Sequence, residues 1–153
     1  IESSDLIELV KSIINDQKPN FDERNITLKL DSKHTSLSCH LDKLHMQMVF
    51  ENILHNANKY SLDGSKVTVS VTATPAKATV KIIDTGIGID KDDIPKLFRK
   101  FSRAENVIST ASGTGLGLYW AKKLVDLHKG EISVESTLGS GTTFSVSIPR
   151  EVR

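Results

Sequence analysis

The sequence predicts an α+β fold: a two-layer sandwich with about three helices on one face of a mixed, mostly antiparallel sheet of about five strands. Two observations lead to this prediction. Apolar residues recur at helical spacing in several long segments, and they alternate with polar residues in several short ones. The length of 153 residues suits one domain, covering residues 1–153, with a core of its own.

The N-terminal part reads as a helix followed by two strands. The helix has apolar residues at helical spacing and polar candidate caps before them, and we expect it to stop before Pro19. The strands are expected at "ITLKL", residues 26–30, and "TSLSC", residues 35–39. The apolar helical residues are Leu6, Leu9, Val10 and Ile13, and the candidate caps are Ser3, Ser4 and Asp5.

A longer helix is predicted over residues 42–60, and its core face is Met46, Val49, Phe50, Ile53 and Ala57. "KVTVSVTAT" and "KATVKIID" alternate around "PA" and predict an antiparallel hairpin. A short helix fits residues 91–101, and residues 102–112 read as a loop. A last helix, residues 115–129, should end at Gly130, before strands at 131–136 and 142–149.

Composition excludes several classes of protein. No apolar run approaches the roughly 18 residues that span a membrane, and nothing resembles a signal peptide. The formal charge of +1 gives no reason to expect a nucleic-acid partner. A lone cysteine, Cys39, excludes an internal disulfide and suits a cytoplasmic setting. The chain opens without methionine, so we interpret it as a fragment.

Three polar side chains form a stripe on the 42–60 helix. Asn52, Asn56 and Lys59 fall at i, i+4 and i+7, rotated away from the apolar face. Carboxamide oxygens suit a hard cation, and an ammonium group suits phosphate, so the stripe is compatible with magnesium and a triphosphate. A solvated polar face is the alternative, although asparagine usually prefers caps and turns to helix interiors.

The stretch "IIDTGIGID", residues 82–90, ends an apolar strand in a carboxylate and two glycines. A buried Asp84 needs a partner, and a bound hydrogen-bond donor would supply one. Gly86 and Gly88 allow close approach of another group, while Ile87 and Ile89 could wall an apolar slot. The alternative is an ordinary β-turn in which the aspartate caps its own loop.

The run "GTGLGL", residues 113–118, opens a helix and could hold phosphate on free N–H groups. Its spacing is not GxGxxG, a polar loop precedes it in place of a strand, and the chain has no GxxxxGK[ST]. A dinucleotide fold and a P-loop are therefore both excluded. The later run "GSGTTF" could be only a hairpin turn.

Taken in order, the motifs resemble the catalytic ATP-binding domain of bacterial sensor histidine kinases, a Bergerat-fold family whose superfamily includes gyrase B and MutL. The matching segments are "ENILHNANKYS", "DTGIGI", "LFRKFSR", "GTGLGL" and "GSGTTF", which look like its N, G1, F, G2 and G3 boxes. The resemblance implies ATP and Mg²⁺ as cofactors. It further implies that residues 1–20 lead in from an absent dimerisation domain.

The resemblance also implies roles for single residues. Asp84 would accept a hydrogen bond from the adenine amino group, and Thr142 would support the same contact through a water molecule. The slot for the base would be shaped by Gly86, Gly88 and Ile89. Asn56 would bind magnesium, Asn52 is the first polar residue of its box, and Lys59 and Tyr60 would reach phosphate and adenine or ribose. Phosphates would lie on Gly113, Thr114, Gly115, Leu116, Gly117 and Leu118. Phe98 and Phe101 would anchor a lid, residues 102–112, from which Arg103 would face the γ-phosphate.

Two positions depart from the pattern. Lys100 stands where the family commonly has arginine, and it lacks the bidentate fork. Asn52 stands where ATP-hydrolysing relatives have a glutamate base, and Glu51 points elsewhere on the helix. We therefore expect slow or negligible hydrolysis, with Asn52, Lys59 and Arg103 as the catalytic residues.

The acceptor is expected outside the chain. None of the five histidines is followed by the acidic residue typical of acceptor histidines; they are His34, His40, His45, His55 and His128. The implied partners are the protein's own dimerisation helices and a response regulator. The resemblance also implies no direct membrane contact by this domain and a parent protein attached to the inner or plasma membrane. Two alternatives stay open: a nucleotide-binding interaction module without transfer, and an ATPase or serine kinase of the same superfamily.

Overall fold

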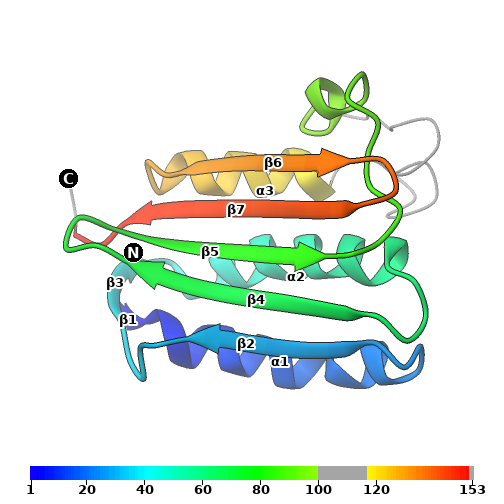
Figure 1. Ribbon diagram of the computed structural model, residues 1–153. Coiled ribbons are helices and arrows are strands. Elements are labelled where there is room, and N and C mark those ends of the chain that lie inside the picture. The colour runs from blue at the N-terminus through cyan, green and yellow to red at the C-terminus, as the bar shows by residue number, and fades with distance from the viewer. Residues whose placement is uncertain (100–116, 152–153) are drawn as a thin grey trace.

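The computed structural model describes residues 1–99 and 117–151 and confirms the predicted fold class (Figure 1). Its helices are α1 (Leu6–Asp22), α2 (Lys43–Tyr60) and α3 (Gly117–Leu127), with a short 3₁₀ helix, η1 (Ile94–Lys96). Its strands are β1 (Glu2–Asp5), β2 (Thr27–Ser32), β3 (Ser38–Leu41), β4 (Lys66–Ala73), β5 (Lys77–Asp84), β6 (Glu131–Thr137) and β7 (Gly141–Pro149).

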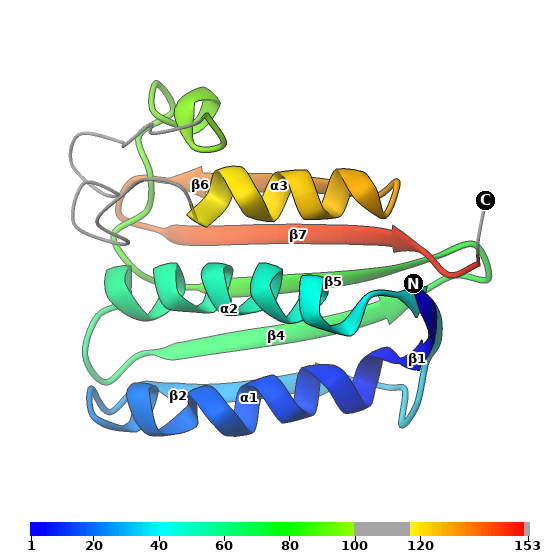
Figure 2. The same cartoon turned by 180° about the vertical axis from the view of Figure 1, so that it is seen from behind.

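The main sheet has five strands in the order β2-β4-β5-β7-β6. The β2/β4 pair is parallel and the other pairs are antiparallel, so the sheet is mixed, as predicted. The three α-helices cover one face of it, with α2 between α1 and α3 (Figure 2). This order brings the carboxyl end of β5 beside the start of β7, next to the last turns of α2.

Helix α2 is the centre of the core. All five residues of its predicted core face are buried, because the apolar stripe lies against the sheet. The helix begins after Asp42, whose carboxylate accepts a hydrogen bond from the His45 N–H at 3.0 Å. At the other end of α2, the Arg24 guanidinium donates hydrogen bonds to the carbonyl oxygens of Asn58 and Ser61 and so stabilises the last turn.

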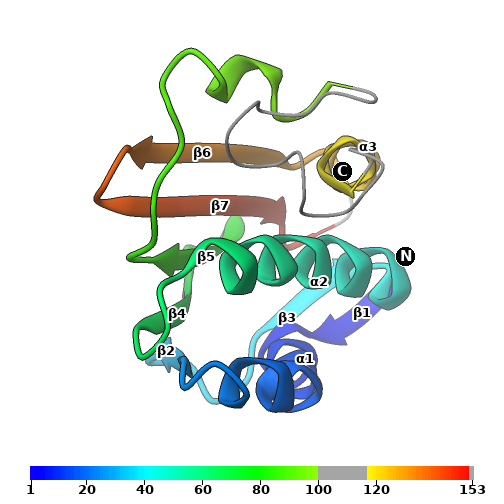
Figure 3. The ribbon, with the colours of Figure 1, turned by 90° about the vertical axis from the view of Figure 1, so that its right-hand side faces the viewer.

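The N-terminal region differs from the prediction in two ways. α1 does not stop before Pro19 but continues to Asp22, because Phe21 is fully buried and anchors the last turn. The second predicted strand does not join the main sheet. It forms β3, which pairs with the unpredicted strand β1 beside α1 (Figure 3). Asp5 ends β1 and caps α1, accepting hydrogen bonds from the N–H groups of Ile7 and Leu37 at 3.0 Å each.

The predicted helix over residues 91–101 is wrong for its described part, which holds only the 3₁₀ turn η1 at Pro95. Helix α3 ends at Leu127, and Lys129, with a φ of 58°, reverses the chain one residue before the expected Gly130. The predicted loop 102–112 lies outside the described residues. Within residues 1–99 and 117–151, no helix has both the length and the apolar character needed to cross a membrane.

Candidate functional site

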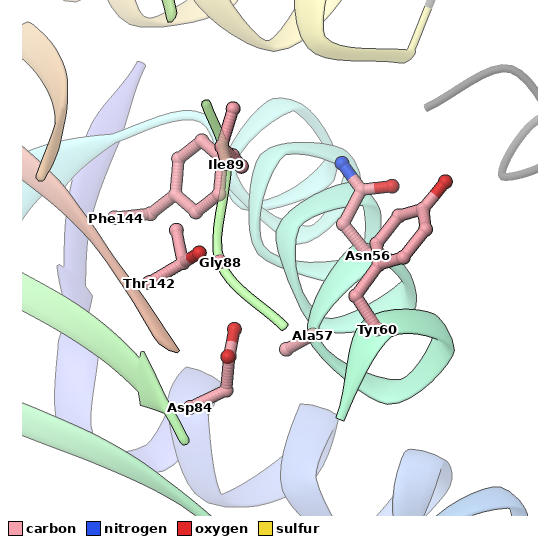
Figure 4. A pocket seen from close by; sticks show the side chains of 8 residues that line it. All are labelled: Asn56, Ala57, Tyr60, Asp84, Gly88, Ile89, Thr142 and Phe144. Atoms are coloured by element: carbon pink, nitrogen blue, oxygen red, sulfur yellow. The ribbon is translucent and has the colours of Figure 1, made fainter. Parts of the chain in front are cut away.

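A pocket lies between the C-terminal half of α2 and the adjoining ends of β5 and β7 (Figure 4). Residues predicted from the motifs supply most of its wall. They are Asn56, Tyr60, Asp84, Gly88, Ile89 and Thr142, joined by Ala57 and Phe144, which were not predicted as site residues. The pocket therefore combines one carboxylate, one carboxamide and two hydroxyl groups with an apolar lining, the composition typical of a small-molecule site.

Asp84 is the acid of this pocket. It is the last residue of β5, is only 7% exposed, and accepts a hydrogen bond from the Gly86 N–H at 2.8 Å. Burial raises the pKa of its carboxyl group, and the backbone N–H groups of Gly86 and Thr142 partly oppose that shift. Figure 4 shows the side chain directed into the pocket, where a ligand donor can reach it.

The loop after Asp84 is held from both sides. The Ile87 N–H donates to the Tyr60 carbonyl at 3.2 Å, and the Ile87 carbonyl accepts from the Gly139 N–H at 2.8 Å. A Cβ at Gly86 would lie 2.0 Å from the Tyr60 carbonyl oxygen. The loop can therefore approach the end of α2 this closely only because residue 86 is glycine. Ile89 consequently lines the pocket, whereas Ile87 is 40% exposed and lies outside it.

Ser136, at the end of β6, is a residue that the sequence reasoning missed. Its Oγ accepts from the Ile89 N–H at 2.7 Å, lies 2.8 Å from Thr142 Oγ1 and donates to the Gly141 carbonyl at 2.8 Å. The pattern "EISVES" could have indicated it. Ile132, Val134 and Ser136 are each two residues apart, so in a strand they lie on the same face of the sheet.

The polar stripe of α2 divides between two surroundings. Asn56 lines the pocket, while the Asn52 side chain packs against the start of α3. A Cβ at Gly117 would lie 3.1 Å from the Asn52 Oδ1. Lys59 is exposed. The Leu118 side chain is buried in the core, so only its backbone is available to a ligand at this helix terminus.

Phe98 is the described part of the predicted lid anchor. Its ring packs edge-on against Phe144 of the pocket wall, with the ring centroids 6.4 Å apart. The other predicted residues of the lid and glycine run lie outside the described residues; they are Lys100, Phe101, Arg103, Gly113, Thr114, Gly115 and Leu116.

The described residues contain no cluster of three or more His, Cys, Asp or Glu side chains that could bind a metal ion. The Asn56 carboxamide fits magnesium as a hard oxygen donor, but it is a single neutral ligand. A cation here would have to take most of its remaining ligands from water and from the phosphates of a bound molecule.

Residues 41–152 match the family described as histidine kinase-, DNA gyrase B-, and HSP90-like ATPase. The chain is 33% identical over 146 residues to the sensor histidine kinase YvrG of Bacillus subtilis, covering 95% of this chain and 25% of YvrG. It thus spans about a quarter of the length of that relative.

Three solved structures share the fold, and two of them are of histidine kinase ThkA. The catalytic domain of histidine kinase ThkA has a TM-score of 0.85 at 24% identity, covering 98% of this chain and 99% of that one. A complex of ThkA with the response regulator protein TrrA has a TM-score of 0.79 at 20% identity, over 97% of this chain and 41% of that one. Full-length ShkA in complex with AMPPNP has a TM-score of 0.86 at 21% identity, covering 99% of this chain and 31% of that one.

The pocket, the order of the motifs around it and the fold agree with these matches. The fold is that of histidine kinase catalytic domains, and the ATPase family to which the chain belongs implies nucleotide binding. The chain is a member of the histidine kinase-, DNA gyrase B- and HSP90-like ATPase family.

Proposed function

We propose that this domain, residues 1–153, binds ATP with Mg²⁺ and donates the γ-phosphate to a histidine on a separate dimerisation domain. One observation carries the proposal: a buried carboxylate, Asp84, faces a slot lined by Ala57, Ile89 and Phe144. An adenine ring is flat and apolar on its faces and carries an amino donor on its edge. It would fill the slot and give Asp84 its hydrogen bond.

The phosphates would extend from this slot toward α3. Asn56 lines the pocket and Asn52 lies against Gly117 at the start of α3, so the two asparagines span the distance from the base to the helix terminus. N–H groups and the dipole at a helix start attract anions. Mg²⁺, held by Asn56 and phosphate oxygens, would neutralise charge there. We assign Tyr60 to the adenine or ribose and Lys59 to phosphate.

The residue at position 52 favours transfer to a protein over hydrolysis. A carboxamide cannot take a proton from water, so Asn52 would position the phosphates without activating an attacking water molecule. In the transfer, the acceptor nitrogen forms a bond to the γ-phosphorus as the bond to the leaving oxygen of ADP breaks. Lys59 and Arg103 would stabilise the negative charge of that step.

The acceptor and the further partners are proposed from the relatives. The chain spans about a quarter of YvrG, and we propose that residues 1–20 lead in from dimerisation helices outside the chain. ThkA is the kinase of a complex with a response regulator, and we propose a partner of that kind here. The domain would work in the cytoplasm, as part of a parent protein attached to the inner or plasma membrane.

Calorimetric titration of ATP with magnesium tests the nucleotide site. The parent should bind, and Asp84→Asn and Asn56→Ala should each bind about ten- to a hundred-fold more weakly, because a charged hydrogen bond or a metal ligand is lost. Asn58→Ala is the matched control, since Asn58 donates to the Asn20 carbonyl on the other side of α2. Absence of binding by the parent would refute the proposal.

The transfer step needs a second experiment. The purified domain is mixed with dimerisation helices and γ-labelled ATP, and the labelled residue is identified. Acid-labile label on histidine is the expected result. Label on serine would indicate the serine-kinase alternative, and release of free phosphate by the domain alone would indicate an ATPase.

A further inference from the structure

We propose that Ser136 is a positioning residue that fixes the direction of the Thr142 hydroxyl proton. The floor of the pocket would then present only hydrogen-bond acceptors and would select adenine over purines that carry a carbonyl at the same position. This inference rests on the proposed function, because it requires a purine base beside Asp84.

The backbone places the three side chains in one row. Asp84 of β5 pairs with Thr142 of β7, and Thr142 pairs with Ser136 of β6. Cross-strand partners extend from the same face of a sheet, so all three belong to the face that carries the helices. Asp84 and Thr142 line the pocket, and Ser136 is the next residue outward in the row.

The hydrogen bonds of Ser136 decide how the hydroxyl protons are shared. Its Oγ has one proton and three partners: the Ile89 N–H at 2.7 Å, the Gly141 carbonyl at 2.8 Å and Thr142 Oγ1 at 2.8 Å. The N–H can only donate and the carbonyl can only accept, so the Ser136 proton goes to Gly141. The third contact is satisfied only if Thr142 donates its own proton to Ser136.

This arrangement has a consequence for the ligand. With its proton given to Ser136, the Thr142 hydroxyl has only lone pairs to offer the pocket, next to Asp84, whose ionised form likewise only accepts hydrogen bonds. Two acceptors side by side suit the amino group of adenine. They disfavour a carbonyl oxygen at the same place, as in hypoxanthine or guanine. A carbonyl oxygen is itself an acceptor, and two acceptors cannot form a hydrogen bond because neither carries a proton.

The test compares the affinity for ATP with that for inosine triphosphate, in which a carbonyl replaces the adenine amino group and the adjacent N1 carries a proton. In Ser136→Ala the Thr142 proton is released and can turn to donate to that carbonyl. We expect the ratio of the two affinities to fall about ten-fold, the value of one hydrogen bond. Ser136→Thr keeps the hydroxyl and should keep the ratio. Ser147→Ala is the matched control, because it removes the 3.0 Å hydroxyl contact with Thr79 elsewhere in the β5/β7 pair.

A double-mutant cycle separates positioning from general loosening. Thr142→Val should itself lower the ratio, and Ser136→Ala added to it should change the ratio no further, because the two residues act as one unit. Equal weakening of both nucleotides by Ser136→Ala, or additive effects in the cycle, would overturn the inference. So would a parent that binds both nucleotides equally. If Ser136→Ala fails to fold, Ser136→Gly, which also removes the hydroxyl, takes its place in the comparison and in the cycle. A parent that binds neither nucleotide would refute the proposed function itself.

Discussion

His128 joins the end of α3 to the start of α2. Its Nε2 accepts the backbone N–H of Asp42 at 3.0 Å, and its Nδ1 lies 2.8 Å from the Leu124 carbonyl, so the ring is neutral with its proton on Nδ1. The ring is buried and meets His45 edge-on. One side chain therefore sets the spacing of two helices at the end of the layer opposite the Asn52–Gly117 contact.

Replacing His128 should lower stability. His128→Ala leaves the Asp42 N–H without its acceptor and opens a small cavity, so the free energy of unfolding should fall by about 2–3 kcal/mol. Urea denaturation measures this. His34→Ala is the control, since His34 is exposed, and it should change stability by less than about 0.5 kcal/mol. A loss for His128→Ala no larger than the control's would contradict the interpretation.

Arg24 gives a prediction that separates hydrogen bonds from a salt bridge. Its guanidinium donates to the carbonyls of Asn58 and Ser61 and to the Asp63 carboxylate, which is 75% exposed. Arg24→Ala should destabilise by about 1.5–3 kcal/mol, because charged hydrogen bonds to the end of α2 are lost. Asp63→Ala should cost less than about 1 kcal/mol, as exposed ion pairs do. Equal losses in urea denaturation would mean that the ion pair carries the stabilisation.

The parts of the fold that periodicity could predict are those where each segment alone has a strong pattern. The α2 core face and the β4/β5 hairpin are of this kind, because their apolar spacing reports burial directly. β1 could not be predicted, because "ESSD" has no strand pattern and becomes a strand only by pairing with β3. Pro19 was misread because the burial of Phe21, a tertiary effect, outweighs a local helix breaker.

The site was predictable from motifs only as a set of residues. The motifs identified Asp84 and Asn56, but they could not say that Asn56 would line the pocket while Asn52 would lie against Gly117. That division depends on how α3 packs on α2. Ser136 was missed for a related reason: a lone serine gains its role only from the strand order that places it beside Thr142.

Gly88 and Gly139 provide a matched pair for testing how the loop after Asp84 is held. Both have positive φ, 75° and 81°, but a Cβ at Gly88 would lie 2.1 Å from the Thr137 oxygen, whereas nothing lies within 4 Å at Gly139. Gly139→Ala should cost about 1–2 kcal/mol for its backbone alone. Gly88→Ala should cost clearly more in urea denaturation and should weaken nucleotide binding. Equal costs would show that the loop moves freely away from β6.

The stability of the ligand-free chain should depend on pH through Asp84. Burial raises the pKa of this carboxyl group above its value in the unfolded chain, so the stability that it contributes is present below the unfolded pKa. That contribution is lost as pH rises through the folded pKa, where the buried group must ionise. Asp84→Asn carries no such charge. It should therefore match the parent near pH 4 and be the more stable of the two at pH 7, as measured by urea denaturation at each pH.

Nucleotide binding should show the opposite trend with pH. The ionised Asp84 is the form that accepts from the adenine amino group, so the affinity of the parent for ATP should fall as pH drops through the folded pKa of this group. Asp84→Asn should bind weakly at every pH, and it serves as the control for titration of the phosphates. Affinity curves that run parallel in the parent and in Asp84→Asn would remove Asp84 from the binding step. A stable but weakly binding Asp84→Asn would show that this site gives up stability in order to recognise its ligand.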